Sequence, residues 1–137
     1  MKASKWHQAS IGSAVVFAGF SAVHLIDDFL FDVPMEFHLT IAFTEVLALA
    51  YMIALVGLIA AASHQSASGY LGLTIAGLLI TLAQILKSIP EILEPGPWHS
   101  GALSELLAVG LAASAAVSAI TSALARRGTA WAGRVPK

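Results

Sequence analysis

The sequence contains no cysteine, and only 11% of its 137 residues are charged. The absence of cysteine excludes disulfide bonds and thiolate metal sites. The scarcity of charge excludes an ordinary soluble domain, because such a domain carries about a quarter charged residues. The chain also lacks a glycine-rich phosphate loop, a nucleophile elbow and a redox dithiol. Its seven basic residues form no run typical of nucleic-acid binding.

Hydrophobic residues make up 58% of the chain and are gathered into four long segments. A helix of about 20 apolar residues crosses the hydrocarbon core of a bilayer, and each segment reaches that length. We therefore predict an all-α integral membrane protein, a four-transmembrane-helix up-down bundle in a single membrane domain over residues 1–137. A cleaved signal peptide is the alternative for the first segment, because Lys2 and Lys5 precede it. The predicted spans are residues 10–31, 39–62, 70–93 and 100–124.

The basic residues lie near the two ends of the chain, apart from Lys87. Positive charge favours the cytoplasmic side, so we expect both termini in the cytoplasm at the plasma membrane, with residues 125–137 as a basic tail. The acidic residues then lie in or beside the two connections that face outward, where chemistry is expected. Because outward loops tolerate acidic residues freely, solvation alone is the alternative explanation for some of them. The acidic residues are Asp27, Asp28, Asp32, Glu36, Glu45, Glu91, Glu94 and Glu105.

The stretches EFHLTIAFTEVLA (residues 36–48) and PWHSGALSELLA (residues 97–108) are similar to each other. Each has an aromatic residue, a histidine, a hydroxyl residue followed by glutamate, and then an apolar run. The similarity predicts an internal repeat: two parallel two-helix units related by a pseudo-twofold axis along the membrane normal. His38 and Glu45 are seven residues apart, whereas His99 and Glu105 are six apart, so the two copies are not equivalent.

Glu45 and Glu105 both lie inside predicted spans. Glu45 is about six residues into its span, which puts it ~9 Å below the outer interface at about 1.5 Å per residue. A carboxylate in the apolar region costs roughly 2.5–3.5 kcal/mol and marks an ion path, a proton relay or a partnered site. Two glutamates at matched depth therefore predict one shared site with His38 and His99.

His24, Asp27 and Asp28 are spaced i, i+3 and i+4, so they share one face of a helix. This spacing suits a histidine and a carboxylate at one metal ion. Nitrogen and oxygen ligands are compatible with zinc, iron, manganese or copper(II), and spacing does not choose among them. In the alternative interpretation the histidines are interfacial residues whose polar tips reach the headgroups. The predicted ligands of a divalent transition metal are His24, His38, His99, Glu45, Glu105 and Asp28, supported by Asp27, Lys87 and Glu91.

Lys87 is the only basic residue far from the chain ends. Glu91 follows four residues later, so we expect an ion pair along the helix that lowers the cost of burying either charge. Pro90 lies between them and removes a backbone hydrogen bond, which predicts a kink near Leu86.

Three functions are compatible with these features. The first is a small membrane protein whose outward-facing histidine–carboxylate site binds a divalent metal or another cation. The second is a subunit of a proton- or cation-coupled transporter or channel, with Glu45 and Glu105 as relay groups; few polar residues in the cytoplasmic halves of spans 39–62 and 100–124 count against a pore through one chain. The third is an accessory or structural subunit. The expected partners are the lipid bilayer and either further copies of the chain or a larger membrane complex.

Overall fold

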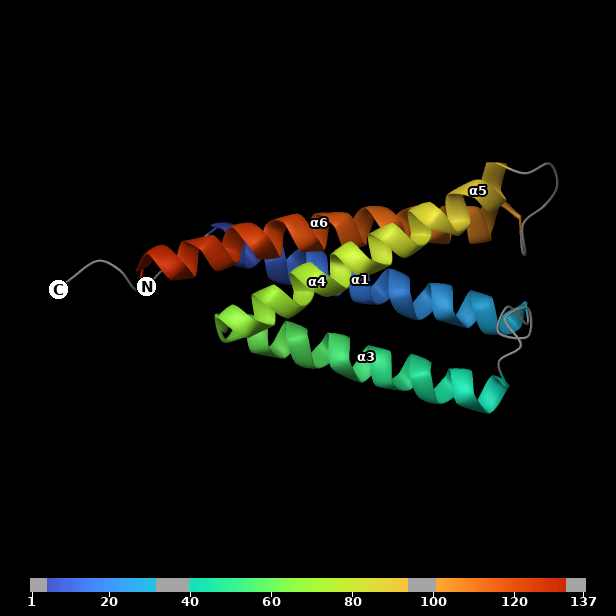
Figure 1. The fold of residues 1–137 in the computed structure, drawn as a ribbon, viewed down its shortest axis with the longest axis horizontal. Coiled ribbons are helices and arrows are strands. Elements are labelled where there is room, and N and C mark those ends of the chain that lie inside the picture. Colours follow the sequence, from blue (N-terminus) through green and yellow to red (C-terminus); the bar gives the residue numbers. More distant parts are fainter. Residues whose placement is uncertain (1–4, 32–39, 94–100, 133–137) are drawn as a thin grey trace.

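The regular elements in the described part of the chain are all helices. The computed structural model describes residues 5–31, 40–93 and 101–132, and α1, α3, α4 and the stretch Ala102–Gly128 of the last helix are long and apolar enough to cross a membrane. The prediction of an all-α protein with four helices that are long and apolar enough to span a membrane is therefore confirmed. The elements in chain order are α1 (Lys5–Leu30), α3 (Ile41–Ser63), α4 (Ala67–Leu86), α5 (Ser88–Leu93) and α6 (Ala102–Ala132) (Figure 1).

α6 is the central helix of the bundle and makes its most extensive contacts with α1 and α4. α3 packs at the edge, against α4 and α1, over a smaller surface. The axes of α3 and α4 are close at their connecting turn and diverge toward the other end (Figure 1). As a result α3 buries only Leu55 and Ala62 among its residues, whereas α6 is buried along a continuous stripe.

Small residues allow α4 and α6 to pack closely. A Cβ atom at Gly77 of α4 would lie 2.5 Å from the carbonyl oxygen of Ala115 and 3.0 Å from the Cβ of Ala119, both on α6. Close backbone approach of this kind is how helices associate in lipid, where apolar burial alone gives little net drive. Gly57 of α3 is different, because no atom lies within 4 Å of a Cβ built there.

The predicted third span is divided in two. α4 ends at Leu86, Lys87 caps it, and the short α5 begins at Ser88, so the third span is interrupted where a kink was predicted. Pro90 lies in the first turn of α5, where a backbone N–H has no partner within the helix and its absence costs little.

The fourth span also differs from its predicted bounds. Helix α6 continues to Ala132, so residues 125–132, predicted as the start of a tail, are helical. Residues 133–137 lie outside the described part of the chain.

The charged residues separate along the bundle. α1 begins and α6 ends at the same end of the molecule (Figure 1). We call this end, which holds Lys5, Arg126 and Arg127, the basic end. The opposite, acidic end holds Asp27, Asp28, Glu45, Lys87 and Glu105. The side of the membrane on which each end lies stays a prediction.

The pseudo-twofold repeat also stays a prediction. It would pair α1 with α4 and α3 with α6. In the described structure α6 is central and α3 is peripheral, so the two helices of the second pair have different surroundings.

Candidate functional site

One face of α1 is buried from end to end, and its last two turns carry polar residues. The buried positions of α1 recur every three or four residues, as expected for one side of a helix with 3.6 residues per turn. Most of this face is apolar or carries hydroxyl groups, but it ends in His24 and Asp27, which are only 7% and 6% exposed. Helix packing therefore places an imidazole and a carboxylate between the helices at the acidic end.

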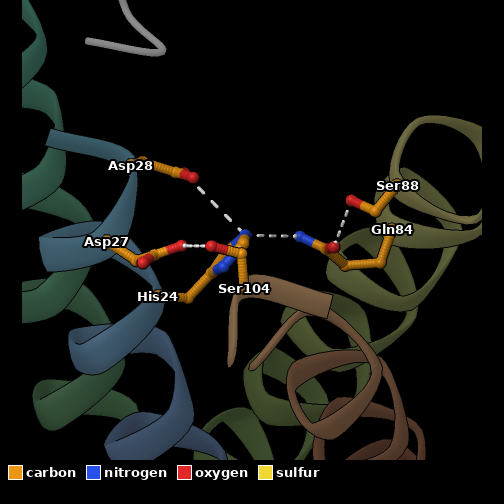
Figure 2. Close-up of polar contacts among 6 residues, drawn as sticks. All are labelled: His24, Asp27, Asp28, Gln84, Ser88 and Ser104. Atoms are coloured by element: carbon orange, nitrogen blue, oxygen red, sulfur yellow. Dashed lines mark hydrogen bonds and ion pairs between the residues drawn. The ribbon is translucent and has the colours of Figure 1, made fainter. Parts of the chain in front are cut away.

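His24, Asp27 and Asp28 form a cluster in which one potential metal ligand atom from each residue lies within 4.8 Å of the others. The Nε2 atom of His24 is 3.8 Å from the Oδ2 atom of Asp28 (Figure 2). Two bonds from a metal to nitrogen and oxygen are about 2.1 Å each and together span up to about 4.2 Å. His24 and Asp28 are therefore close enough to hold one cation without movement of the backbone.

Gln84 of α4 contacts the same nitrogen of His24. Its side-chain Nε2 lies 3.3 Å from His24 Nε2, and its Oε1 accepts a 2.5 Å hydrogen bond from the hydroxyl of Ser88 (Figure 2). With the amide held this way, Gln84 donates, His24 Nε2 accepts, and the ring proton belongs on Nδ1. The lone pair that accepts from Gln84 is also the one that a metal ion would take.

The other ring nitrogen of His24 is an exception to normal packing. Nδ1 is buried and has no hydrogen-bond partner among the described residues. Leaving such a group unpaired costs about 1–3 kcal/mol, and unpaired buried groups in folded proteins call for an explanation such as a functional role or a bound ion or water. Packing thus holds His24 in its position despite the cost of leaving Nδ1 without a hydrogen bond among the described residues.

Asp27 is held from the side of α6. The hydroxyl of Ser104 donates a 2.5 Å hydrogen bond to Asp27 Oδ2, and both residues are buried. A hydrogen bond to a charged acceptor is stronger than one between neutral groups. This contact fixes the orientation of the carboxylate and joins α1 to the central helix beside His24.

A cavity of about 310 Å³ lies next to the cluster, between α1, α3 and α4. Its polar wall includes His24, Asp28, Gln84, Lys87 and Ser88. Its apolar wall includes Leu25, Leu47, Ile80 and Leu111. The hydroxyls of Tyr51 and Ser21, which also line the cavity, form a 2.8 Å hydrogen bond that ties α3 to α1. The site therefore combines titratable groups with enough space for a small ligand.

The other predicted site residues are distributed differently. Lys87 is half-buried and lines the cavity, and its supporting role stays a prediction. Glu45 is exposed on α3, and Glu105 is half-buried in the first turn of α6. Among the described residues, neither glutamate belongs to a group of three potential ligands. His38 and His99 lie outside the described residues, as does the side chain of Glu91, so the shared site of the two histidines and two glutamates and the Lys87–Glu91 ion pair stay predictions.

Gln84, Ser88 and Ser104 were not predicted to belong to the site. Together with the predicted Lys87, Gln84 and Ser88 have the spacing i, i+3 and i+4, the same as His24, Asp27 and Asp28. This spacing places the polar side chains of each span on one helix face, but it does not specify that the two faces meet. Ser104 is the hydroxyl residue of the repeated stretch 97–108, but that pattern does not point to Asp27, and a single serine in an apolar helix is common.

Comparison with known proteins yields no relative of this chain. No protein-family model matches it, and no curated protein and no solved structure matches it. The residues and their geometry are therefore the basis on which function is inferred.

Proposed function

We propose that the protein binds one divalent transition-metal ion at the acidic end of the bundle, with His24 and Asp28 as direct ligands and Asp27 as the third. The observation that carries this proposal is the 3.8 Å separation of His24 Nε2 and Asp28 Oδ2 at the wall of a cavity. One imidazole and two carboxylates form a hard nitrogen–oxygen set, which suits zinc, manganese or iron(II) better than copper(I).

The energetics of burial support a cation at this position. Asp27 is buried and Asp28 is partly buried, and a carboxylate removed from water is costly unless it is neutralised or hydrogen-bonded. Ser104 provides a hydrogen bond to Asp27, and a divalent ion would balance the charge of both aspartates. Three protein ligands would also leave at least one position of a four-coordinate metal open, as in catalytic and transport sites that exchange a water for a substrate.

The test is a titration of purified protein with Zn²⁺ and Mn²⁺ by calorimetry, together with elemental analysis. One ion per chain is expected. His24→Ala and Asp28→Asn should each weaken binding at least about 100-fold, since even changes to the partners of metal ligands cost 10–100-fold. His64→Ala is the matched control, because His64 is exposed at the turn between α3 and α4, at the basic end. A wild-type protein that binds neither ion, or variants that bind as tightly as wild type, would refute the proposal.

The proposed orientation places the site on the outer side of the plasma membrane. The support is the positive-inside rule applied to the basic end. Because the chain has no cysteine, single cysteines can report on sidedness. In intact cells, a membrane-impermeant maleimide should label the variant Phe31→Cys, whose cysteine lies at the acidic end of the bundle. It should leave His64→Cys, at the basic end, unlabelled. The reverse pattern would overturn the orientation.

Cation- or proton-coupled transport is a second candidate, and the basic half of the bundle favours it. Few polar residues were expected there, but helix packing brings several together. Ser10 and Ser13 of α1 form 2.8 Å hydrogen bonds with Ser122 and Thr121 of α6, and the buried hydroxyl of Ser118 has no partner among the described residues. These contacts give the basic half of α6 more polar character than expected from the few polar residues counted there. The test is uptake of metal ions into proteoliposomes that contain the protein. If the wild type takes up metal and Ser10→Ala/Ser122→Ala does not, although the variant still binds metal, transport is established.

A further inference from the structure

The basic end of the bundle carries a groove of a different character from the acidic site. It has a volume of about 380 Å³ and lies between α4 and α6. Two arginines near the end of α6, Arg126 and Arg127, line it together with Leu71, Thr74 and Ala123. Both arginines are exposed. The groove thus joins two guanidinium groups to an apolar surface.

We propose that this groove binds one anionic phospholipid, with its phosphate on Arg126 and Arg127 and part of an acyl chain against Leu71 and Ala123. Guanidinium groups bind phosphate oxygens with two parallel hydrogen bonds and remain charged under all relevant conditions. Basic pockets between spanning helices are suited to anionic lipid headgroups for this reason. This site is separate from the metal site and does not depend on it.

The position of the groove in the bundle favours a lipid over a soluble anion. Leu71 and Ala123 lie within the segments that are long and apolar enough to span a membrane, so acyl chains are the molecules that surround them. The spanning part of α6 ends at Gly128. Arg126 and Arg127 lie directly before this end, at the level expected for lipid headgroups. A free phosphate would satisfy the arginines but would leave the apolar part of the groove unfilled.

The charge of the basic end adds a long-range component. Each basic residue near a membrane surface raises the affinity for anionic lipid about fivefold. Lys5 shares that general attraction from the start of α1, but it does not line the groove. If the groove is a specific site, replacing either arginine should reduce the affinity for anionic lipid more than replacing Lys5 does.

The experiment is native mass spectrometry of the full chain in neutral detergent, with phosphatidylglycerol and phosphatidylcholine added at equal concentration. The wild-type protein should retain one phosphatidylglycerol in preference to phosphatidylcholine. Arg126→Gln/Arg127→Gln should bind phosphatidylglycerol more than about 30-fold more weakly, which exceeds the general contribution of two surface charges. Each single arginine variant should bind more weakly than Lys5→Gln, which removes one positive charge at the same end and should lose at most about fivefold in affinity.

A variant with its charges intact tests the apolar part. Ala123→Phe fills the groove and should abolish retention of the lipid, while circular dichroism should confirm an unchanged helix content. Inorganic phosphate in large excess should leave phosphatidylglycerol bound. Equal losses in Lys5→Gln and the single arginine variants would reduce the effect to general surface charge and overturn the proposal. Displacement by inorganic phosphate, or retention of the lipid by Ala123→Phe, would overturn it as well.

Discussion

The hydroxyl of Ser104 on α6 donates a 2.5 Å hydrogen bond to the Asp27 carboxylate on α1. The two residues are 77 positions apart in the chain, and both are buried. This contact links the central helix to the metal cluster, because Asp27 and Asp28 are adjacent and His24 lies one turn earlier on the same helix. Stability of the bundle and geometry of the site are therefore coupled through one hydroxyl.

Removing this hydroxyl should destabilise the protein. In Ser104→Ala the Asp27 carboxylate loses a donor in a buried position, and a hydrogen bond to a charged group contributes about 1.5–3 kcal/mol. We expect a loss of that order in the free energy of unfolding, measured by denaturant titration in detergent micelles. Ser63→Ala is the control, since the exposed Ser63 bonds, among the described residues, only the Ala60 carbonyl of its own helix. Equal stability of the two variants would show that the contact between α1 and α6 is not important.

Removing the positive charge at the cavity should strengthen metal binding. Lys87 lines the cavity together with His24 and Asp28, so its ammonium group opposes a divalent cation there. In Lys87→Met the dissociation constant for Zn²⁺ should fall about fivefold, which corresponds to about 1 kcal/mol. Calorimetry provides the measurement, and Lys5→Met, at the basic end, should leave the constant unchanged. Weaker binding in Lys87→Met would mean that the lysine supports the site in another way.

A methyl group between α4 and α6 should be poorly tolerated. The Cβ of Gly77→Ala would meet the Ala115 carbonyl oxygen at 2.5 Å, which forces the two backbones apart. Overpacking of this kind costs about 1–3 kcal/mol, and it should appear as a lower thermal unfolding midpoint. Gly57→Ala makes the same chemical change where no atom lies within 4 Å, so it should be neutral or slightly stabilising, because alanine favours helix over glycine. If both variants unfold at the wild-type midpoint, the close approach of α4 and α6 is not tight enough to matter.

The cluster on α1 was predictable because it is local. The i, i+3 and i+4 spacing of His24, Asp27 and Asp28 places them on one face of any helix that contains them, and the structure has them within 4.8 Å. The length of the apolar segments likewise predicts four spans, since bilayer thickness sets that length. The interruption near Leu86 lies where Pro90 predicted a kink, because proline removes a backbone hydrogen bond one turn earlier.

Contacts between helices were not predictable in the same way. The spacing of residues along α3 and α6 does not specify how far each helix is rotated about its axis. That rotation leaves Glu45 exposed and Glu105 half-buried. Gln84 contacts His24 although the two residues are 60 positions apart in the chain. No local pattern specifies such a distance, because it depends on which small residues let α4 and α6 approach.

The sequence by itself determined that the chain is a membrane protein with four spanning helices, that its charges separate toward two ends, and that His24, Asp27 and Asp28 lie together. These properties depend on apolar length, on residue order and on the 3.6-residue turn. The tertiary structure alone decided that Gln84 and Ser104 complete the surroundings of this cluster, that Lys87 faces the same cavity, and that two arginines meet a groove at the opposite end. The physical reason is that helix rotation, crossing and divergence are set by packing between distant segments, and the edge position of α3 opens the space in which the site lies.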